Sequence, residues 1–123
     1  MIHAWLKATV TVVLLLAAPS MAGAQWVEDG AGIVTREDYQ ANHKMLADGD
    51  NGAFIVWDDI RNGAHYEIYM QRVDRWGNPL WTADGVTITG MLAVDQRYPA
   101  ITHDGGTGAL VCYTDNNLGG TNI

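Results

Sequence analysis

Short apolar runs alternate with glycine-rich polar stretches along this chain, and one such arrangement occurs twice. In the first copy, polar residues 48–52 (DGDNG) precede the apolar run 53–57 (AFIVW). In the second copy, residues 104–108 (DGGTG) precede residues 109–113 (ALVCY), 56 positions later. A glycine-rich turn that leads into a continuous apolar run predicts a β-hairpin whose second strand is buried on both faces.

The repeat is wider than the two apolar runs. Gln40 recurs as Gln96 at the same interval, and the stretch that starts at Trp26 recurs from Trp81 at an interval that is shorter by one position. Self-similarity at a fixed period of this size indicates a repeat architecture. We therefore expect residues 40–67 to superpose on the second copy as equivalent hairpin-containing units.

Each period contains several short strand candidates and no predicted helix. Strands are expected at residues 44–47, 53–57, 66–73, 80–81, 86–88 and 100–103, with a loop over 38–43 and turns at 61–63 and 74–78. About four short strands joined by tight turns are the content of a propeller blade, whereas parallel β-helices, the alternative, have shorter periods. The prediction is an all-β fold, an incomplete β-propeller of about two four-stranded repeats.

Residues 1–24 have the plan of a secretory signal peptide. An apolar run over residues 8–18 follows one positive charge, and small residues at 22–24 offer a cleavage site after Ala24. A membrane anchor is the alternative, but spanning a bilayer takes about 20 apolar residues. We expect residues 25–123 to be exported (secreted, periplasmic or on the cell surface), with no membrane span after cleavage.

The formal net charge of −7 argues against nucleic acid and anionic lipid as partners, because both attract basic surfaces. It is compatible with cation binding or with simple solubility, and solubility is the preferred interpretation. Cys112 is the only cysteine in the sequence, so no disulfide framework is expected. Because Cys112 occupies the place of Val56 in the other copy, it is predicted to be a small buried hydrophobe.

The first unit resembles a known tandem repeat. Residues 52–63 (GAFIVWDDIRNG), 67–74 (EIYMQRVD) and 77–81 (GNPLW) are similar to repeats of large secreted bacterial proteins, which often stand upstream of a C-terminal sorting domain. The resemblance implies a β-propeller with a blade layout similar to that of sialidase-like propellers, packed against further repeats of the same chain. Thr114 and Asn117 depart from the pattern. Fewer than two units cannot close a propeller, so the chain is expected to be the N-terminal fragment of a longer protein.

Two groups of acidic residues are candidates for chemistry. Asp48 and Asp50 have the spacing of a calcium loop, but the second copy keeps the glycines and loses the second acid, which favours a structural turn. Asp58 and Asp59 are adjacent and would point to opposite faces of a strand. One of them is expected to bind Arg61 or a backbone N–H at the strand end.

No catalytic constellation is evident in the sequence. The histidines lack the spacing of a zinc site, no nucleophile elbow or phosphate loop occurs, and the arginine cluster with a Tyr–Glu pair that a sialidase needs is not identified. Arg72 is predicted to form a salt bridge between repeats. Trp57 and Trp81 are predicted to be core residues. Trp76, in a polar turn beside Arg75, is the best candidate for a surface contact.

The sequence therefore favours a non-enzymatic secreted or cell-surface repeat module for binding or scaffolding, with a glycan, a protein or a surface as its partner and no cofactor. The alternative is the N-terminal part of a glycoside-active, sialidase-like propeller enzyme whose catalytic residues lie beyond Ile123. A purely structural spacer is a third possibility. The absence of a catalytic motif favours the first interpretation, although fold alone does not fix function.

Overall fold

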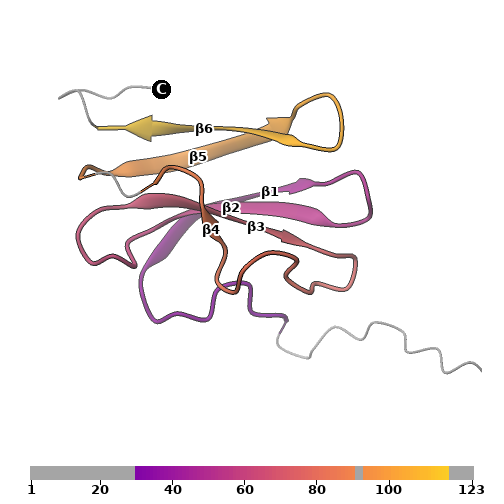
Figure 1. Cartoon of the computed structure of the whole chain (residues 1–123), viewed down its shortest axis with the longest axis horizontal. Coiled ribbons are helices and arrows are strands. Elements are labelled where there is room, and N and C mark those ends of the chain that lie inside the picture. Colours follow the sequence, from indigo (N-terminus) through magenta and orange to yellow (C-terminus); the bar gives the residue numbers. More distant parts are fainter. Residues whose placement is uncertain (1–29, 91–92, 117–123) are drawn as a thin grey trace, which may run out of the picture.

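The computed structural model describes residues 30–90 and 93–116, and in these residues the protein is all-β without a helix, as predicted. The strands are β1 (Gln40–Ala47), β2 (Ala53–Asp59), β3 (Glu67–Val73), β4 (Val86–Thr87), β5 (Gln96–His103) and β6 (Ala109–Asp115). They form one antiparallel sheet in the order β1-β2-β3-β4 and a second antiparallel sheet of β5 and β6 (Figure 1). These sheets do not close into a ring, so the propeller stays a prediction. The predicted signal peptide lies outside the described residues.

The two copies of the repeat adopt the same hairpin, which confirms the predicted equivalence for their described parts. Each first strand carries a bulge at the same place, between Ala41 and Lys44 in β1 and between Arg97 and Ala100 in β5. The bulges coincide with left-handed backbone conformations, with φ values of 53° in the first copy and 57° at Tyr98 in the second. The sequence therefore dictates the same local backbone twice.

Two local predictions were wrong. The loop expected over residues 38–43 is largely strand, because the bulge lets β1 begin at Gln40 and still pair along β2. The strand expected at Leu80 and Trp81 does not form. Pro79 makes only an isolated bridge with Val73, since proline has no N–H to extend a ladder.

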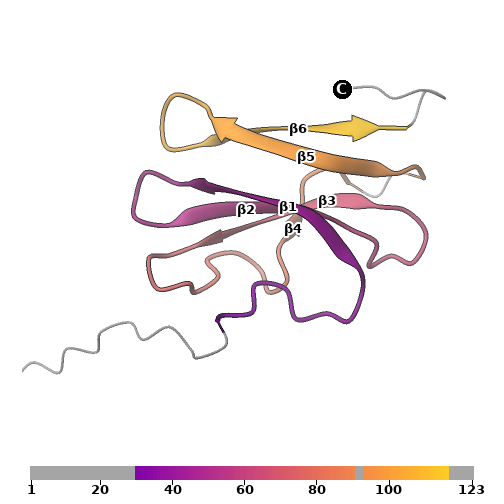
Figure 2. The same cartoon turned by 180° about the vertical axis from the view of Figure 1, so that it is seen from behind.

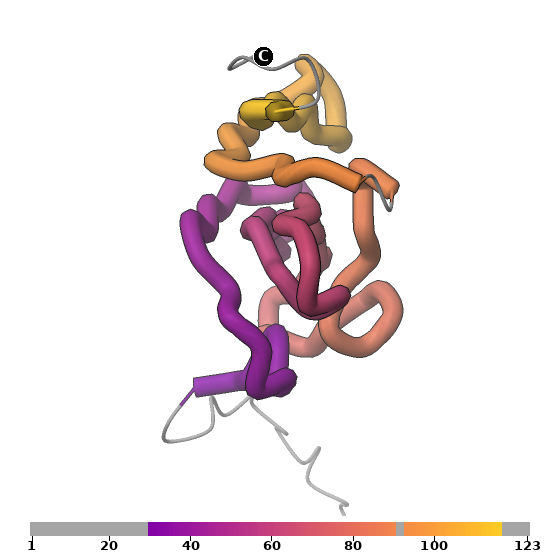
Figure 3. The backbone as a smooth tube through the Cα atoms, turned by 90° about the vertical axis from the view of Figure 1, so that its left-hand side faces the viewer, coloured from indigo at the N-terminus to yellow at the C-terminus, as the bar shows by residue number. Residues whose placement is uncertain are grey.

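The second sheet lies over one face of the first, as Figures 1 and 2 show from opposite sides and Figure 3 shows from the end. Side chains alternate along a strand, so each sheet has two distinct faces. The buried core at this junction comes from β2 and β3: Phe54, Val56, Ile68 and Met70. Partly buried side chains packed against it are Leu46, Ile101, Ala109, Val111 and Tyr113.

Polar contacts fix the two sheets at the end of the junction nearest the bulges. The Asp58 side chain is fully buried, and its Oδ2 accepts hydrogen bonds from Asn42 Nδ2 at 2.7 Å and from the backbone N–H of Tyr98 at 3.1 Å. Asp95 Oδ1 accepts from the backbone N–H of Tyr66 at 3.0 Å. Hydrogen bonds to a buried carboxylate are directional, so they set the position of β5 across the first sheet.

The far face of the second sheet is uncovered by any described element. Leu110 on this face is 60% exposed. Cys112 is also exposed, so its predicted burial was wrong. Its counterpart Val56 is fully buried because the second sheet covers it. Equivalent positions in the repeat thus have equivalent backbones and different surroundings.

Candidate functional site

The turn between β3 and Pro79 is organised by one carboxylate. Asp74 Oδ1 accepts hydrogen bonds from the backbone N–H groups of Trp76 at 2.8 Å and Asn78 at 2.9 Å. The Asn78 side chain donates to Asp74 Oδ2 at 2.8 Å, and this bond holds the pKa of Asp74 below its usual range. Gly77, with φ of 81°, supplies the left-handed step that lets the turn close. A turn with so many internal bonds is held in one shape.

This turn presents Trp76 and Arg75 to solvent, as the sequence predicted for Trp76. The Trp76 side chain is 51% exposed, and the guanidinium carbon of Arg75 lies 5.5 Å from the centre of its ring. That distance is within the range of a cation–π contact. An exposed indole can stack on an apolar face of a partner, and the neighbouring guanidinium can donate hydrogen bonds to its oxygens. The turn is therefore the candidate binding site.

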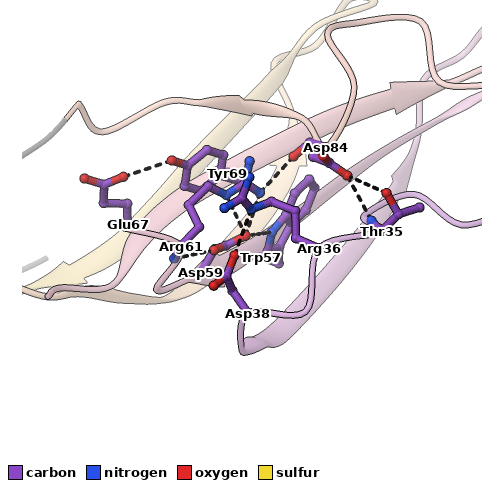
Figure 4. A network of polar contacts seen from close by, with 9 residues as sticks. All are labelled: Thr35, Arg36, Asp38, Trp57, Asp59, Arg61, Glu67, Tyr69 and Asp84. Atoms are coloured by element: carbon purple, nitrogen blue, oxygen red, sulfur yellow. Dashed lines mark hydrogen bonds and ion pairs between the residues drawn. The ribbon is translucent and has the colours of Figure 1, made fainter. Parts of the chain in front are cut away.

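A second polar cluster, drawn in Figure 4, includes Trp57 and Asp59, which alternate along β2 with the core residue Val56 and so lie on the face that points away from the second sheet. At its centre, Asp59 Oδ1 accepts from the backbone N–H of Arg61 at 2.8 Å, and Oδ2 accepts from Arg61 Nη2 at 2.6 Å and Trp57 Nε1 at 3.1 Å. Burial pushes the pKa of Asp59 up, but the bonds from Arg61 and Trp57 outweigh it and hold the pKa below its usual range. Of the alternatives left open by the sequence, Asp59 is the acid that binds Arg61 and its backbone N–H.

Arg61 is fully engaged within this cluster. Its guanidinium carbon lies 3.7 Å from the centre of the Tyr69 ring, and Nη2 also donates to the backbone oxygen of Asp84 at 2.8 Å. Asp84 Oδ1 in turn accepts from the backbone N–H of Thr35 at 2.9 Å. The cluster thereby joins β2, the loop after Pro79 and the segment before β1, which indicates a structural role.

The cluster also contains a Tyr–Glu pair that the sequence did not reveal. The Tyr69 hydroxyl donates to Glu67 Oε2 at 3.0 Å, and Asn62 Nδ2 donates to Oε1 at 2.9 Å. Burial and the bond to Glu67 raise the pKa of Tyr69 to about 12. A nucleophilic hydroxyl needs the opposite shift, and both side chains are buried, so this pair favours stability over catalysis. The sequence feature that could have revealed this pair is the spacing of Glu67 and Tyr69, because residues two positions apart in a strand lie on the same face.

The two calcium candidates do not form a cation cage. Asp48 Oδ1 accepts from the backbone N–H groups of Asp50 and Gly52, both at 2.8 Å, and Oδ2 accepts from Arg72 Nε at 2.7 Å. The Asp50 carboxylate lies 3.8 Å from Arg72 Nη2 and is mostly exposed. A guanidinium thus stands between the two carboxylates, where a bound cation would have to be. This geometry favours the structural turn.

Two further predictions are corrected by these contacts. The ion pair of Arg72 with Asp48 lies within the first sheet and does not join two repeats. Trp57 is 2% exposed and is a core residue as predicted, whereas Trp81 is 37% exposed. The Trp81 ring only borders the core, 6.0 Å from the centre of the Phe54 ring, because the strand that would have buried it does not form.

Comparisons with protein-family models, curated proteins and solved structures gave no match to this chain. Within residues 30–90 and 93–116 there is no helix long and apolar enough to cross a membrane. The same residues contain no group of three or more histidine, cysteine and acidic side chains arranged to hold a metal ion. Among the described residues, the candidate binding site is the turn that carries Trp76 and Arg75.

Proposed function

We propose that this protein is a non-enzymatic, exported repeat module that binds a glycan, a protein or a surface through the turn that carries Trp76 and Arg75. The observation that carries this proposal is a difference in exposure. The turn presents its side chains to solvent, whereas the polar cluster around Asp59, which we call the buried cluster, does not. The turn is preorganised and exposes an indole beside a guanidinium. Preorganised aromatic contacts lose little entropy on binding, which makes such a turn an efficient recognition element.

The fold supports a scaffolding role for the rest of the chain. The first repeat forms a four-stranded antiparallel sheet with sequential strand order, and the second repeat stacks on it face to face. These are features of propeller blades, and the propeller remains part of this proposal. The proposed export depends on the signal peptide expected at residues 1–24.

The contacts within the buried cluster around Asp59 support a structural role for its carboxylates. Its carboxylates, Asp59 and Glu67, already accept hydrogen bonds from neighbouring side chains. A general acid or base must be reachable by substrate, and the side chains of Asp59 and Glu67 are buried. The alternative, a sialidase-like enzyme with catalytic residues beyond Ile123, receives no support from this cluster.

A substitution of Trp76 by alanine tests the proposal. We expect W76A to change the free energy of unfolding by less than about 0.5 kcal/mol, as for other surface positions, and to abolish binding on glycan arrays and to cell-surface preparations. The matched control is Tyr39→Ala, which removes another exposed aromatic ring (61% exposed) and should leave binding unchanged. Unfolding of W76A, equal binding by W76A and the wild type, or hydrolase activity of the chain would each contradict the proposal.

A further inference from the structure

The contact between the two sheets joins two different faces. The first sheet contributes what we call the front face, represented by Leu46, Phe54 and Val56. The second sheet contributes what we call the back face, represented by Ile101, Ala109 and Val111. Because both hairpins share one register, each sheet has a front face and a back face at equivalent positions. The observed junction is therefore front to back.

The front face of the second sheet is unoccupied by described residues. Thr102, Leu110 and Cys112 are the counterparts, one repeat later, of Leu46, Phe54 and Val56 and occupy the same places on it. A shallow depression of about 170 Å³ on this sheet is lined in part by Leu110 and Cys112. The front face of the second sheet is thus apolar and accessible. It has the same backbone geometry as the front face of the first sheet, which is buried in the junction.

The back face of the first sheet is the complementary half. Met45, Ala53 and Ile55 are the counterparts, one repeat earlier, of Ile101, Ala109 and Val111. The Met45 side chain is 73% exposed, and Ile55 borders a pocket of about 210 Å³ that is also lined by Ile33 and Trp57. The other end of this face is covered by the Asp59 cluster, so the accessible part is the end that carries Met45.

We propose that copies of this chain associate head to tail, with the front face of the second sheet of one copy bound to the back face of the first sheet of the next. On the front face, Leu110 and Cys112 would take the places that Phe54 and Val56 have in the internal contact. On the back face, Met45 and Ile55 would take the places of Ile101 and Val111. The occupant is a second copy because the molecule carries both halves of a contact that it already makes internally. Such a contact is heterologous and can continue from copy to copy.

Charge modulates this association. The chain has a formal net charge of −7, so copies repel one another in dilute salt. Added sulfate or phosphate screens this repulsion and also strengthens the burial of apolar surface. The self-association is therefore expected to become tighter as the ionic strength rises, in contrast to an association held by ion pairs.

Two charged variants test the proposal, each blocking one face. L110D places a charge on the front face of the second sheet, and M45K places a charge on the back face of the first. Both side chains are exposed within the chain, so folding should be kept, which circular dichroism checks. In sedimentation velocity at increasing concentration, the wild type should form growing oligomers, and each variant alone should self-associate at least about tenfold more weakly.

The mixture of the two variants is the decisive measurement. L110D keeps an intact back face and M45K keeps an intact front face, so the mixture should form a 1:1 dimer that does not grow further. The control L80D charges an exposed residue of the loop after Pro79, outside both faces, and should associate like the wild type. A wild type that stays monomeric at all concentrations, loss of association in one variant only, or no dimer in the mixture would each overturn the proposal.

Discussion

The β1–β2 and β5–β6 hairpins have the same register, bulge and turn, yet the second strand is mostly buried in the first hairpin and mostly accessible in the second. Val56 is inaccessible to solvent, whereas Cys112 at the equivalent position is exposed. Asp48 is 2% exposed, whereas Asp104 lies in solvent. The comparison teaches that the local sequence determines the hairpin backbone, and that the neighbouring strands and sheets determine which of its residues become core.

The hairpin turns show this separation most directly. Asp104 Oδ1 accepts from the N–H groups of Gly106 at 2.7 Å and Gly108 at 3.1 Å, as Asp48 does in the first turn. What differs is Arg72, which comes from β3 and covers the Asp48 carboxylate. The aspartate therefore shapes the turn by itself, and its burial depends on a strand that belongs to the rest of the sheet.

The largest expected difference between the hairpins is in their apolar side chains. Phe54→Ala removes a buried ring from the junction and should lower the free energy of unfolding by about 3–5 kcal/mol. Leu110→Ala, at the equivalent exposed position, should change it by less than about 0.5 kcal/mol. Denaturant titration of both variants at low protein concentration measures the difference. Equal losses would show that the second sheet is covered as fully as the first.

A smaller difference is expected between two glycines with left-handed backbones. Gly85 has φ of 83°, and a Cβ there would lie 2.5 Å from Trp57 Cη2 and 2.9 Å from the Met70 carbonyl oxygen. Gly105, in the second hairpin turn, has φ of 94° and no atom within 4 Å of such a Cβ. Alanine at either position costs about 1–2 kcal/mol for the backbone, and the clash adds about 1–3 kcal/mol at Gly85.

Thermal and denaturant unfolding of G85A and G105A separates these two contributions. The backbone cost is common to both variants, so the difference between their free energies of unfolding measures the clash with Trp57 and with the Met70 carbonyl oxygen. A G105A variant as unstable as G85A would mean that the second hairpin turn is packed against other parts of the chain. That result would contradict the conclusion that the side chains of the first sheet are covered and those of the second sheet are accessible.

A further effect, of about the same size as the difference between the two glycines, concerns the closed cluster of the first sheet. Tyr69→Phe removes the donor to the buried Glu67 Oε2 and should cost about 1–3 kcal/mol. Since the pKa of Tyr69 is raised from 10.0 to about 12, its contribution is complete below pH 10 and is lost as the pH rises toward 12. Between pH 8 and pH 11, the free energy of unfolding should therefore fall less in Y69F than in the wild type. The same fall in both would exclude Tyr69 as the titrating group.

Local features of the sequence were sufficient for the all-β class, the repeat and the hairpins, because glycines, turn residues and apolar runs act within a few residues. They also predicted the exposure of Trp76, which follows from its own polar turn. The exposure of Cys112 and the partner of Arg72 could not be predicted from local sequence. Each depends on which elements, distant in the sequence, pack against the residue. The bond between Tyr69 and Glu67 was missed although the two residues lie on one strand, because their spacing alone does not show that both side chains are buried together.

The front-to-back junction has a consequence for the evolution of such a chain. Because the two faces of one sheet are the two halves of a single contact, duplication of a unit adds a new contact without requiring a new surface. Substitutions are then constrained between neighbouring units, so a position such as Phe54 should covary with Val111 in the following unit more strongly than with residues of its own back face. The number of units can change by recombination while the rules for packing them stay the same.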